Sequence, residues 1–164
     1  MIEAGMRYVR CTAIAGVLLA GCAGGSEAVR PQEENPHRRA EAGPAHDMAL
    51  QHFIDGSVYE LKGDVAQAIL EYQDALRYEK NHAMYHALAR CYSALEKHTL
   101  AIEAGREAVR LSPDNLDYRS TLAQVYVSAF EIDSAAAEYE EIVRRDPNSL
   151  DSRYNLARLY QGRK

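Results

Sequence analysis

From residue 49 onward, apolar residues recur at spacings of three and four, the pattern of one face of an amphipathic helix. The clearest such face consists of Tyr85, Leu88, Ala89 and Tyr92. Short polar segments separate the helical stretches, and Pro113 and Pro147 stand where a helix has to end. The pattern therefore predicts a series of amphipathic helices without a sheet.

The same pattern returns with a period of 33 or 34 residues. Several position classes share this period, so the chain contains internal repeats. The recurring residues are Tyr59, Tyr92, Tyr126 and Tyr160; Ala68, Ala101 and Ala135; Leu88, Leu122 and Leu156; and Pro113 and Pro147. Each period holds two helices, and one unit cannot bury its apolar face without a neighbour. We therefore expect the units to stack.

The repeated residues resemble the tetratricopeptide repeat (TPR), in which Leu-Gly/Ala and Tyr mark the first helix and Ala, an aromatic residue and Pro mark the second half. The third unit matches with Leu122-Ala123, Tyr126, Ala135, Tyr139 and Pro147. The second unit has Gly105 in place of the aromatic residue, and the first has Lys80 in place of Pro. The resemblance implies an all-α fold, a right-handed α-solenoid of about three and a half helix-turn-helix units.

The predicted units cover residues 49–81, 82–115 and 116–149, followed by the first helix of a fourth unit at 150–164. This last helix carries more apolar residues than one face can hide, namely Leu150, Tyr154, Leu156, Leu159 and Tyr160. Solenoid ends normally have a polar capping helix. Two explanations stay open: the chain is the N-terminal fragment of a longer TPR scaffold, or the uncapped helix self-associates or binds a partner.

The N-terminus has the layout of a targeting signal. Arg7 and Arg10 precede an uncharged apolar run that is too short and too rich in glycine for a good membrane span. The run ends in Leu19-Ala20-Gly21-Cys22, which resembles the bacterial lipobox. The resemblance implies that residues 1–21 are a lipoprotein signal peptide and that Cys22 is acylated, for instance with palmitate. The alternatives are a secretory signal cut at Ala20 or Gly21, or an uncleaved anchor.

Ala23, not Asp, follows Cys22. In lipoproteins of double-membraned bacteria this pattern resembles sorting to the outer membrane, with an inner-membrane anchor as the alternative. Residues 22–47 contain Pro31, Pro36 and Pro44 and only one sizeable aliphatic residue, Val29. Such a segment buries too little apolar surface to fold. We therefore predict a lipidated Cys22 followed by a disordered, flexible linker to residue 47.

Composition and motifs narrow the possible functions. The chain has 164 residues and a net charge of −5, which disfavours nucleic acid as a partner. It lacks a Gly-rich phosphate loop, a nucleophile elbow and a Cys/His cluster, so we expect neither catalytic residues nor cofactors. His82 and His86 lie four residues apart but lack a third ligand, so we predict surface histidines and no metal. Cys91 should be a buried free thiol.

In the TPR family, the first helices of successive units line a concave surface that binds extended or helical peptides. By register, this surface would carry Phe53, Ser57, Glu60, His86, Arg90, Ser120, Gln124, Tyr154 and Arg158. The family's carboxylate clamp uses Lys, Asn and Arg, whereas the corresponding positions here hold Phe53, Ser57, Ala87, Asp117 and Thr121. Chaperone-tail binding is therefore not expected. Arg90 and Arg158 either pair with acidic partners or are simply solvated.

The sequence thus predicts a membrane-anchored, non-catalytic TPR scaffold or adaptor of a bacterial cell envelope, facing the periplasm. It would bind proteins or peptides of the envelope. The alternatives are the fragment of a longer scaffold described above, or a non-catalytic subunit of an envelope enzyme or of a secretion or pilus assembly complex.

Overall fold

The computed structural model describes residues 43–162. The predicted signal peptide 1–21, Cys22 and most of the linker lie outside the described residues. Within residues 43–162 the chain forms seven helices and no strand. They are α2 (Pro44–Leu61), α3 (Val65–Tyr78), α4 (His82–Ala94), α5 (His98–Leu111), α6 (Leu116–Ser128), α7 (Ile132–Arg145) and α8 (Leu150–Gln161). The predicted all-α fold is confirmed. None of these helices is long and apolar enough to cross a bilayer.

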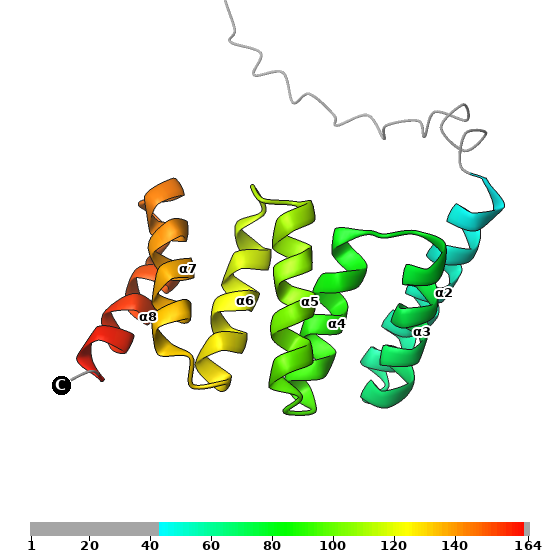
Figure 1. The fold of residues 1–164 in the computed structure, drawn as a ribbon, viewed down its shortest axis with the longest axis horizontal. Helices are drawn as coiled ribbons and strands as arrows, with labels where there is room; N and C mark the ends of the chain where they lie inside the picture. The colour runs from blue at the N-terminus through cyan, green and yellow to red at the C-terminus, as the bar shows by residue number, and fades with distance from the viewer. Residues whose placement is uncertain (1–42, 163–164) are drawn as a thin grey trace, which may run out of the picture. The chain divides into compact units, whose positions relative to one another are not determined.

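The helices pack in chain order, each against the next (Figure 1). Helices α2 and α3, α4 and α5, and α6 and α7 form antiparallel pairs, and each pair contacts the following one. In addition, α4 contacts α6, so first helices of neighbouring units meet directly. One continuous core of buried residues extends from α3 to α8. This is the stacking expected of a solenoid whose units cannot bury their apolar faces alone.

Three first helices start where the predicted units start: α4 at His82, α6 at Leu116 and α8 at Leu150. Helix α2, however, begins at Pro44, earlier than the predicted start at residue 49. The linker predicted to reach residue 47 therefore overlaps the first turn of α2. Proline at the first helical position needs no N–H partner and has a helical φ. The added turn also leads into Ala49, which is completely buried beside Ala75 and Met84.

The recurring residues lie at the contacts between neighbouring helices. Ala68, Ala101 and Ala135 are all completely buried, and such small side chains let neighbouring helices approach closely. The recurring tyrosines reach back to the second helix of the preceding unit. The Tyr92 hydroxyl accepts a hydrogen bond from Gln73 Nε2 at 2.6 Å, and the Tyr126 hydroxyl accepts one from Arg106 Nε at 2.7 Å.

The turns inside the helix pairs share one backbone geometry. Gly63 has a left-handed conformation, with φ of 81°, and Asp64 caps α3 by accepting a hydrogen bond from the Gln67 N–H at 3.2 Å. The equivalent residues in the next two units are Glu96 and Phe130, with φ of 56° and 61°. These two units therefore form the same turn with a non-glycine residue in the left-handed region, which is sterically unfavourable.

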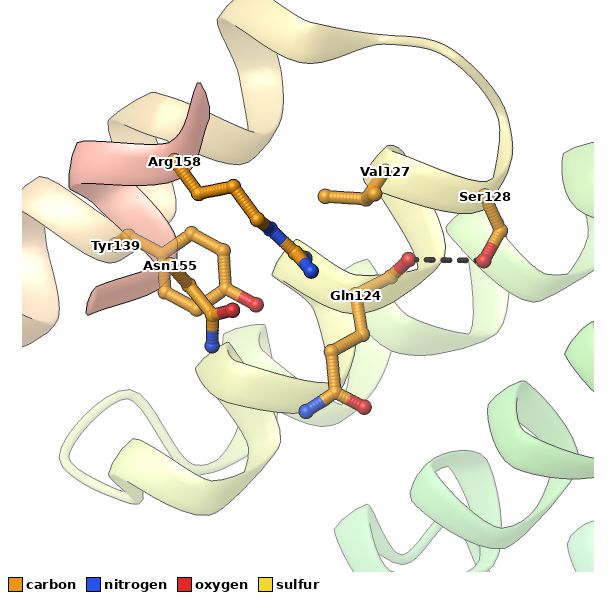
Figure 2. Close-up of a pocket in the computed structure, with 6 residues that line it drawn as sticks. All are labelled: Gln124, Val127, Ser128, Tyr139, Asn155 and Arg158. Atoms are coloured by element: carbon orange, nitrogen blue, oxygen red, sulfur yellow. Dashed lines mark hydrogen bonds between the residues drawn. The ribbon is translucent and has the colours of Figure 1, made fainter. Parts of the chain in front are cut away.

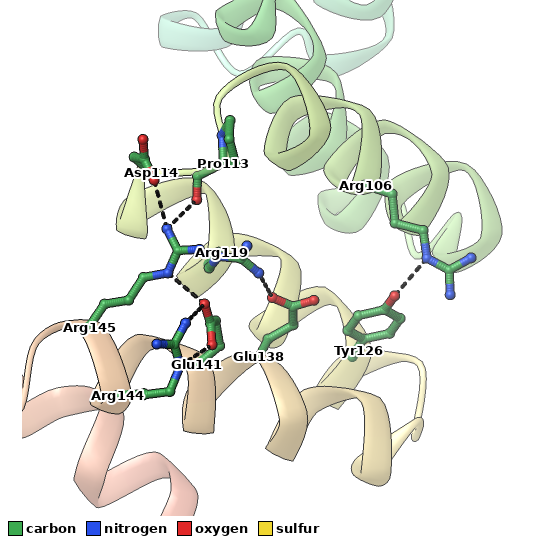
Figure 3. A network of polar contacts seen from close by, with 9 residues as sticks. All are labelled: Arg106, Pro113, Asp114, Arg119, Tyr126, Glu138, Glu141, Arg144 and Arg145. Atoms are coloured by element: carbon green, nitrogen blue, oxygen red, sulfur yellow. Dashed lines mark hydrogen bonds and ion pairs between the residues drawn. The ribbon is translucent and has the colours of Figure 1, made fainter.

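Polar contacts stabilise the third unit and join it to the second (Figure 3). Arg119 of α6 pairs with Glu138 of α7 at 2.7 Å, and both side chains are largely buried. Arg145 at the end of α7 donates to the Pro113 carbonyl at 3.0 Å and pairs with Asp114 at 2.9 Å. These contacts fix the turn between α5 and α6 against the end of α7, and so help to orient the helices that carry the candidate site.

Candidate peptide-binding face

The predicted site residues lie on the first helices of the units, α2, α4, α6 and α8. The structure distributes them over three junctions between first helices, which differ in chemistry. Each residue's role depends on what faces it from the next unit.

At the α2–α4 junction the polar residues satisfy one another. The Glu60 carboxylate accepts a hydrogen bond from the Tyr72 hydroxyl at 2.9 Å and forms an ion pair with Arg90. Ser57 also accepts a hydrogen bond from Tyr72, at 3.2 Å. Burial raises the pKa of Tyr72 to about 12, so its hydroxyl stays protonated and acts as a donor. The half-buried ring of Phe53 lies 5.6 Å from that of Tyr72, centroid to centroid.

At the α4–α6 junction two histidines bond across to the next helix. His82 Nδ1 lies 2.9 Å from the Tyr118 hydroxyl, and His86 Nε2 lies 2.9 Å from the Thr121 hydroxyl. Burial, followed by the positive charge of Arg90, lowers the pKa of His86. Residues 43–162 contain no group of three or more His, Cys, Asp or Glu side chains placed to hold a metal ion. Here the two histidines link neighbouring units.

At the α6–α8 junction there is an open pocket of about 290 Å³, shown in Figure 2. Two of the predicted site residues, Gln124 and Arg158, meet here. The complete lining is Gln124, Val127, Ser128, Tyr139, Asn155 and Arg158. Ser128 donates a hydrogen bond to the Gln124 backbone carbonyl at 3.1 Å. Arg158 is the only charged side chain in the lining.

The structure brings some predicted residues together and separates others. Glu60 meets Arg90, and Gln124 meets Arg158. Ser120 lies beside Gln124, with its hydroxyl 3.5 Å from the Gln124 amide nitrogen. Tyr154 is 68% exposed and does not line this pocket.

Sequence reasoning missed several residues of this face. Asn155 lies one position from the predicted Tyr154, and Tyr118 lies on α6 opposite the two histidines. Tyr139 comes from a second helix, where the repeat register implies a purely internal role. Its side chain is almost completely buried, yet it lines the α6–α8 pocket. The recurrence of this tyrosine two units apart, at Tyr72, was the available signal.

A second pocket of about 150 Å³ lies between the start of α2 and the start of α4. It is lined mainly by apolar side chains, including Leu50, Phe53 and Met84. His46 and Glu79 meet at its edge, with His46 Nδ1 2.6 Å from the Glu79 carboxylate.

Comparisons with known proteins find the same kind of repeat. Two sequence models of the tetratricopeptide repeat match residues 56–115 and 94–159. No curated protein matches the sequence of this chain. Together the two matches span most of the described helices.

Solved structures share the fold at low sequence identity. MamA is 21% identical with a TM-score of 0.68, covering 77% of this chain and 74% of its own. The first TPR of Spaghetti (RPAP3), bound to the HSP90 peptide SRMEEVD, is 21% identical with a TM-score of 0.66. The match covers 71% of this chain and 93% of the Spaghetti chain. YrrB, a TPR protein with an unusual peptide-binding site, is 23% identical with a TM-score of 0.65. The match covers 70% of this chain and 60% of the YrrB chain. Such identities establish similarity of fold alone.

Proposed function

Because this chain is a tetratricopeptide-repeat protein, we propose that it acts as a membrane-anchored, non-catalytic scaffold in a bacterial cell envelope. The folded part binds a segment of a partner protein across α2, α4, α6 and α8. The lipid on Cys22 holds the protein at the outer membrane, and the linker lets the helices reach partners in the periplasm.

The observation that carries the binding role is the open α6–α8 pocket. Binding sites are usually concave and present a few convergent polar groups. In this pocket the polar residues Gln124, Asn155 and Arg158 line one volume. Two of the similar structures are described as peptide-binding TPR proteins, which favours a peptide as the ligand.

The anchoring role is supported by the sequence of the N-terminus. A basic segment, an apolar run and the Leu19-Ala20-Gly21-Cys22 motif follow in the order typical of a lipoprotein signal. A multiply acylated cysteine binds a membrane stably, since each buried methylene contributes about 0.8 kcal/mol.

Metabolic labelling with radioactive palmitate tests the anchor. The full chain, expressed in a double-membraned bacterium, should be labelled and should fractionate with membranes. Cys22→Ser should lose both properties, whereas the matched control Cys11→Ser should keep both, because Cys11 lies in the cleaved segment. Unchanged labelling of the Cys22→Ser protein would contradict lipidation at this residue.

Site-specific photo-crosslinking in living cells tests the binding role. A photoreactive amino acid at Gln124 should capture a discrete envelope protein, because this residue lines the pocket. The control position is Arg110, an exposed residue near the end of the second helix α5. Equal capture from both positions, or capture of cytosolic proteins only, would contradict the proposed role.

A further inference from the structure

Helix α2, at one end of the row of helices in Figure 1, has an exposed apolar face, here called the outer face. It consists of four side chains that are between 40% and 89% exposed, namely Leu50, Ile54, Val58 and Leu61. Their intervals of four and three residues place them on one side of the helix, roughly opposite the buried Ala49 and Gly56. A helix that is apolar on both sides is typical of an element that protein covers on both sides.

In the later units the same side of the first helix is an interface. Three residues are equivalent to Val58 in the repeat register and are 2%, 2% and 8% exposed: Cys91 of α4, Val125 of α6 and Leu159 of α8. They are buried because each of these helices packs against the preceding unit. Val58 is 40% exposed, since α2 is the first helix of the described part of the chain. Solenoid ends normally present a polar surface, so this apolar end is an expected contact site for another polypeptide.

The two ends of the outer face have complementary shapes. At its C-terminal end, the Leu61 side chain is 89% exposed. At its N-terminal end, Leu50 lines the pocket of about 150 Å³, together with Phe53 and Met84. An apolar cavity of about this size holds a group as large as benzene, so the pocket has room for one leucine side chain.

The two ends of the outer face also carry opposite charges. Asp47 lies in the first turn of α2, and Glu79 lines the edge of the pocket. The exposed Lys62 follows Leu61 directly, and its Nζ lies 5.5 Å from the centroid of the Tyr59 ring. When two copies of this face meet in antiparallel orientation, the basic end of each faces the acidic end of the other.

We infer that the outer face of α2 binds the same face of a second copy of this chain, in an antiparallel arrangement with two-fold symmetry. The symmetry axis passes near Ile54, midway between Leu50 and Val58. Leu61 of each copy enters the pocket of the other copy, and Lys62 lies near Asp47 of the partner subunit. Such a self-complementary contact closes after two copies. The inference goes beyond the proposed scaffold role and does not depend on it.

This dimer differs from self-association through the uncapped helix α8. Helix α8 exposes Leu150 and Tyr154, and a contact between α8 of one copy and α2 of the next would be head to tail. Head-to-tail contacts that do not close into a ring produce open chains of copies. Pairing of two α2 helices is favoured because the exposed leucine, the pocket and both charges lie on one surface.

The first test is sedimentation velocity of the purified full chain carrying Cys11→Ser and Cys22→Ser, which leaves the buried Cys91 as its only cysteine. Between about 10 µM and about 1 mM, we expect an equilibrium of monomer and dimer without larger species.

The second test is disulfide crosslinking in the same background. Ile54→Cys should form a disulfide-linked dimer on mild oxidation, because the symmetry axis brings the two Cα atoms to the roughly 4.4–6.8 Å that a disulfide requires. The matched control is Leu70→Cys on α3, which is 53% exposed in the parent but lies off the outer face. It should stay reduced under the same conditions.

Four variants sharpen the result. Leu61→Asp should lower the dimer association constant by roughly tenfold or more, because a buried apolar contact is lost from each half of the interface. Asp47→Lys and Lys62→Glu should each weaken the dimer, and the protein that carries both should recover most of the loss. Tyr154→Asp, the control on α8, should dimerise as the parent does. Melting curves for all variants establish that they are folded.

Several outcomes would overturn the inference. These are a parent that stays monomeric at the highest concentration, a dimer that Leu61→Asp leaves unchanged, or a dimer that Tyr154→Asp removes. Failure of the doubly charge-exchanged protein to recover would contradict the antiparallel arrangement. Photo-crosslinking from Gln124 tests the proposed function separately, because that residue lies at the α6–α8 junction and not on α2.

Discussion

Helices α6 and α8 share the same sequence pattern but have different surroundings. Helix α6 packs against α4, α5 and α7, whereas α8 packs mainly against α7 and meets α6 at the pocket. Leu122 and Tyr126 of α6 are 1% and 4% exposed, but the equivalent Tyr160 of α8 is 42% exposed. Leu150 and Tyr154 of α8 also face solvent. Burial in this fold is therefore a property of the neighbours and not of the helix sequence alone.

Truncation of the repeated leucine is expected to give the largest difference in stability between variants of α6 and of α8. Leu122→Ala should lower the free energy of unfolding by about 2–5 kcal/mol, because the side chain is completely enclosed. Leu156→Ala, at the equivalent but half-buried position of α8, should cost about 1 kcal/mol. Urea denaturation measures both values. Equal losses would show that α8 is as well covered as α6.

Enlargement of the repeated alanine is expected to have the next largest effect on stability. Ala123 is completely buried between helices, so Ala123→Leu should overpack the seam and cost about 1–3 kcal/mol. Ala157 is the exposed counterpart on α8, and Ala157→Leu should change stability by less than about 0.5 kcal/mol. Thermal unfolding followed by circular dichroism distinguishes the two. A large loss in the Ala157→Leu protein would argue against the open side of α8.

Removal of the tyrosine hydroxyl has a smaller effect. Tyr126→Phe deletes the acceptor of the hydrogen bond from Arg106 Nε and should cost about 1 kcal/mol. Tyr160→Phe should cost less, because Tyr160 bonds to the exposed Glu140 and water can replace that contact. A double-mutant cycle of Tyr126→Phe with Arg106→Ala measures the coupling. Additive losses would mean that the contact contributes nothing.

The smallest expected effect is a pH dependence of the α4–α6 contact. The folded-state pKa of His86 is lowered, first by burial and then by Arg90, although Asp117 and Glu60 oppose the shift. The unfolded chain therefore binds the proton more readily, so stability is full above the unfolded pKa of about 6.5 and falls as the pH drops toward the folded pKa.

His86→Gln should reduce the loss of thermal stability between about pH 7 and pH 5. An identical profile for the parent and the His86→Gln protein would show that His86 does not titrate with unfolding. The expected change lies in the α4–α6 contact, so α8 should be unaffected.

The repeat register predicted most of the fold. The periodic tyrosines, alanines and prolines place α4 to α8, and Gly63 with Asp64 places the first turn. The early start of α2 was not predictable in this way, because it lies before the first repeated residue. The helix continues into Ala49, which is buried beside Ala75 of the same unit and Met84 of the next.

The candidate site was less predictable than the fold. The register identifies which residues lie on first helices, and so it named Gln124 and Arg158. It does not show that Glu60 and Arg90 neutralise each other, because that pairing depends on side chains from two units. It also does not show that the buried Tyr139 of the second helix α7 lines the pocket. Those properties arise from packing across a junction.

Hydrogen exchange of the full chain, measured by mass spectrometry, tests the central claim most directly, because exchange reports the free energy of local opening. If neighbours supply the burial, the amides of α4, α5 and α6 should exchange only through global unfolding, while those of α8 exchange faster through local opening. Equal protection of α6 and α8 in the monomeric protein would contradict the account.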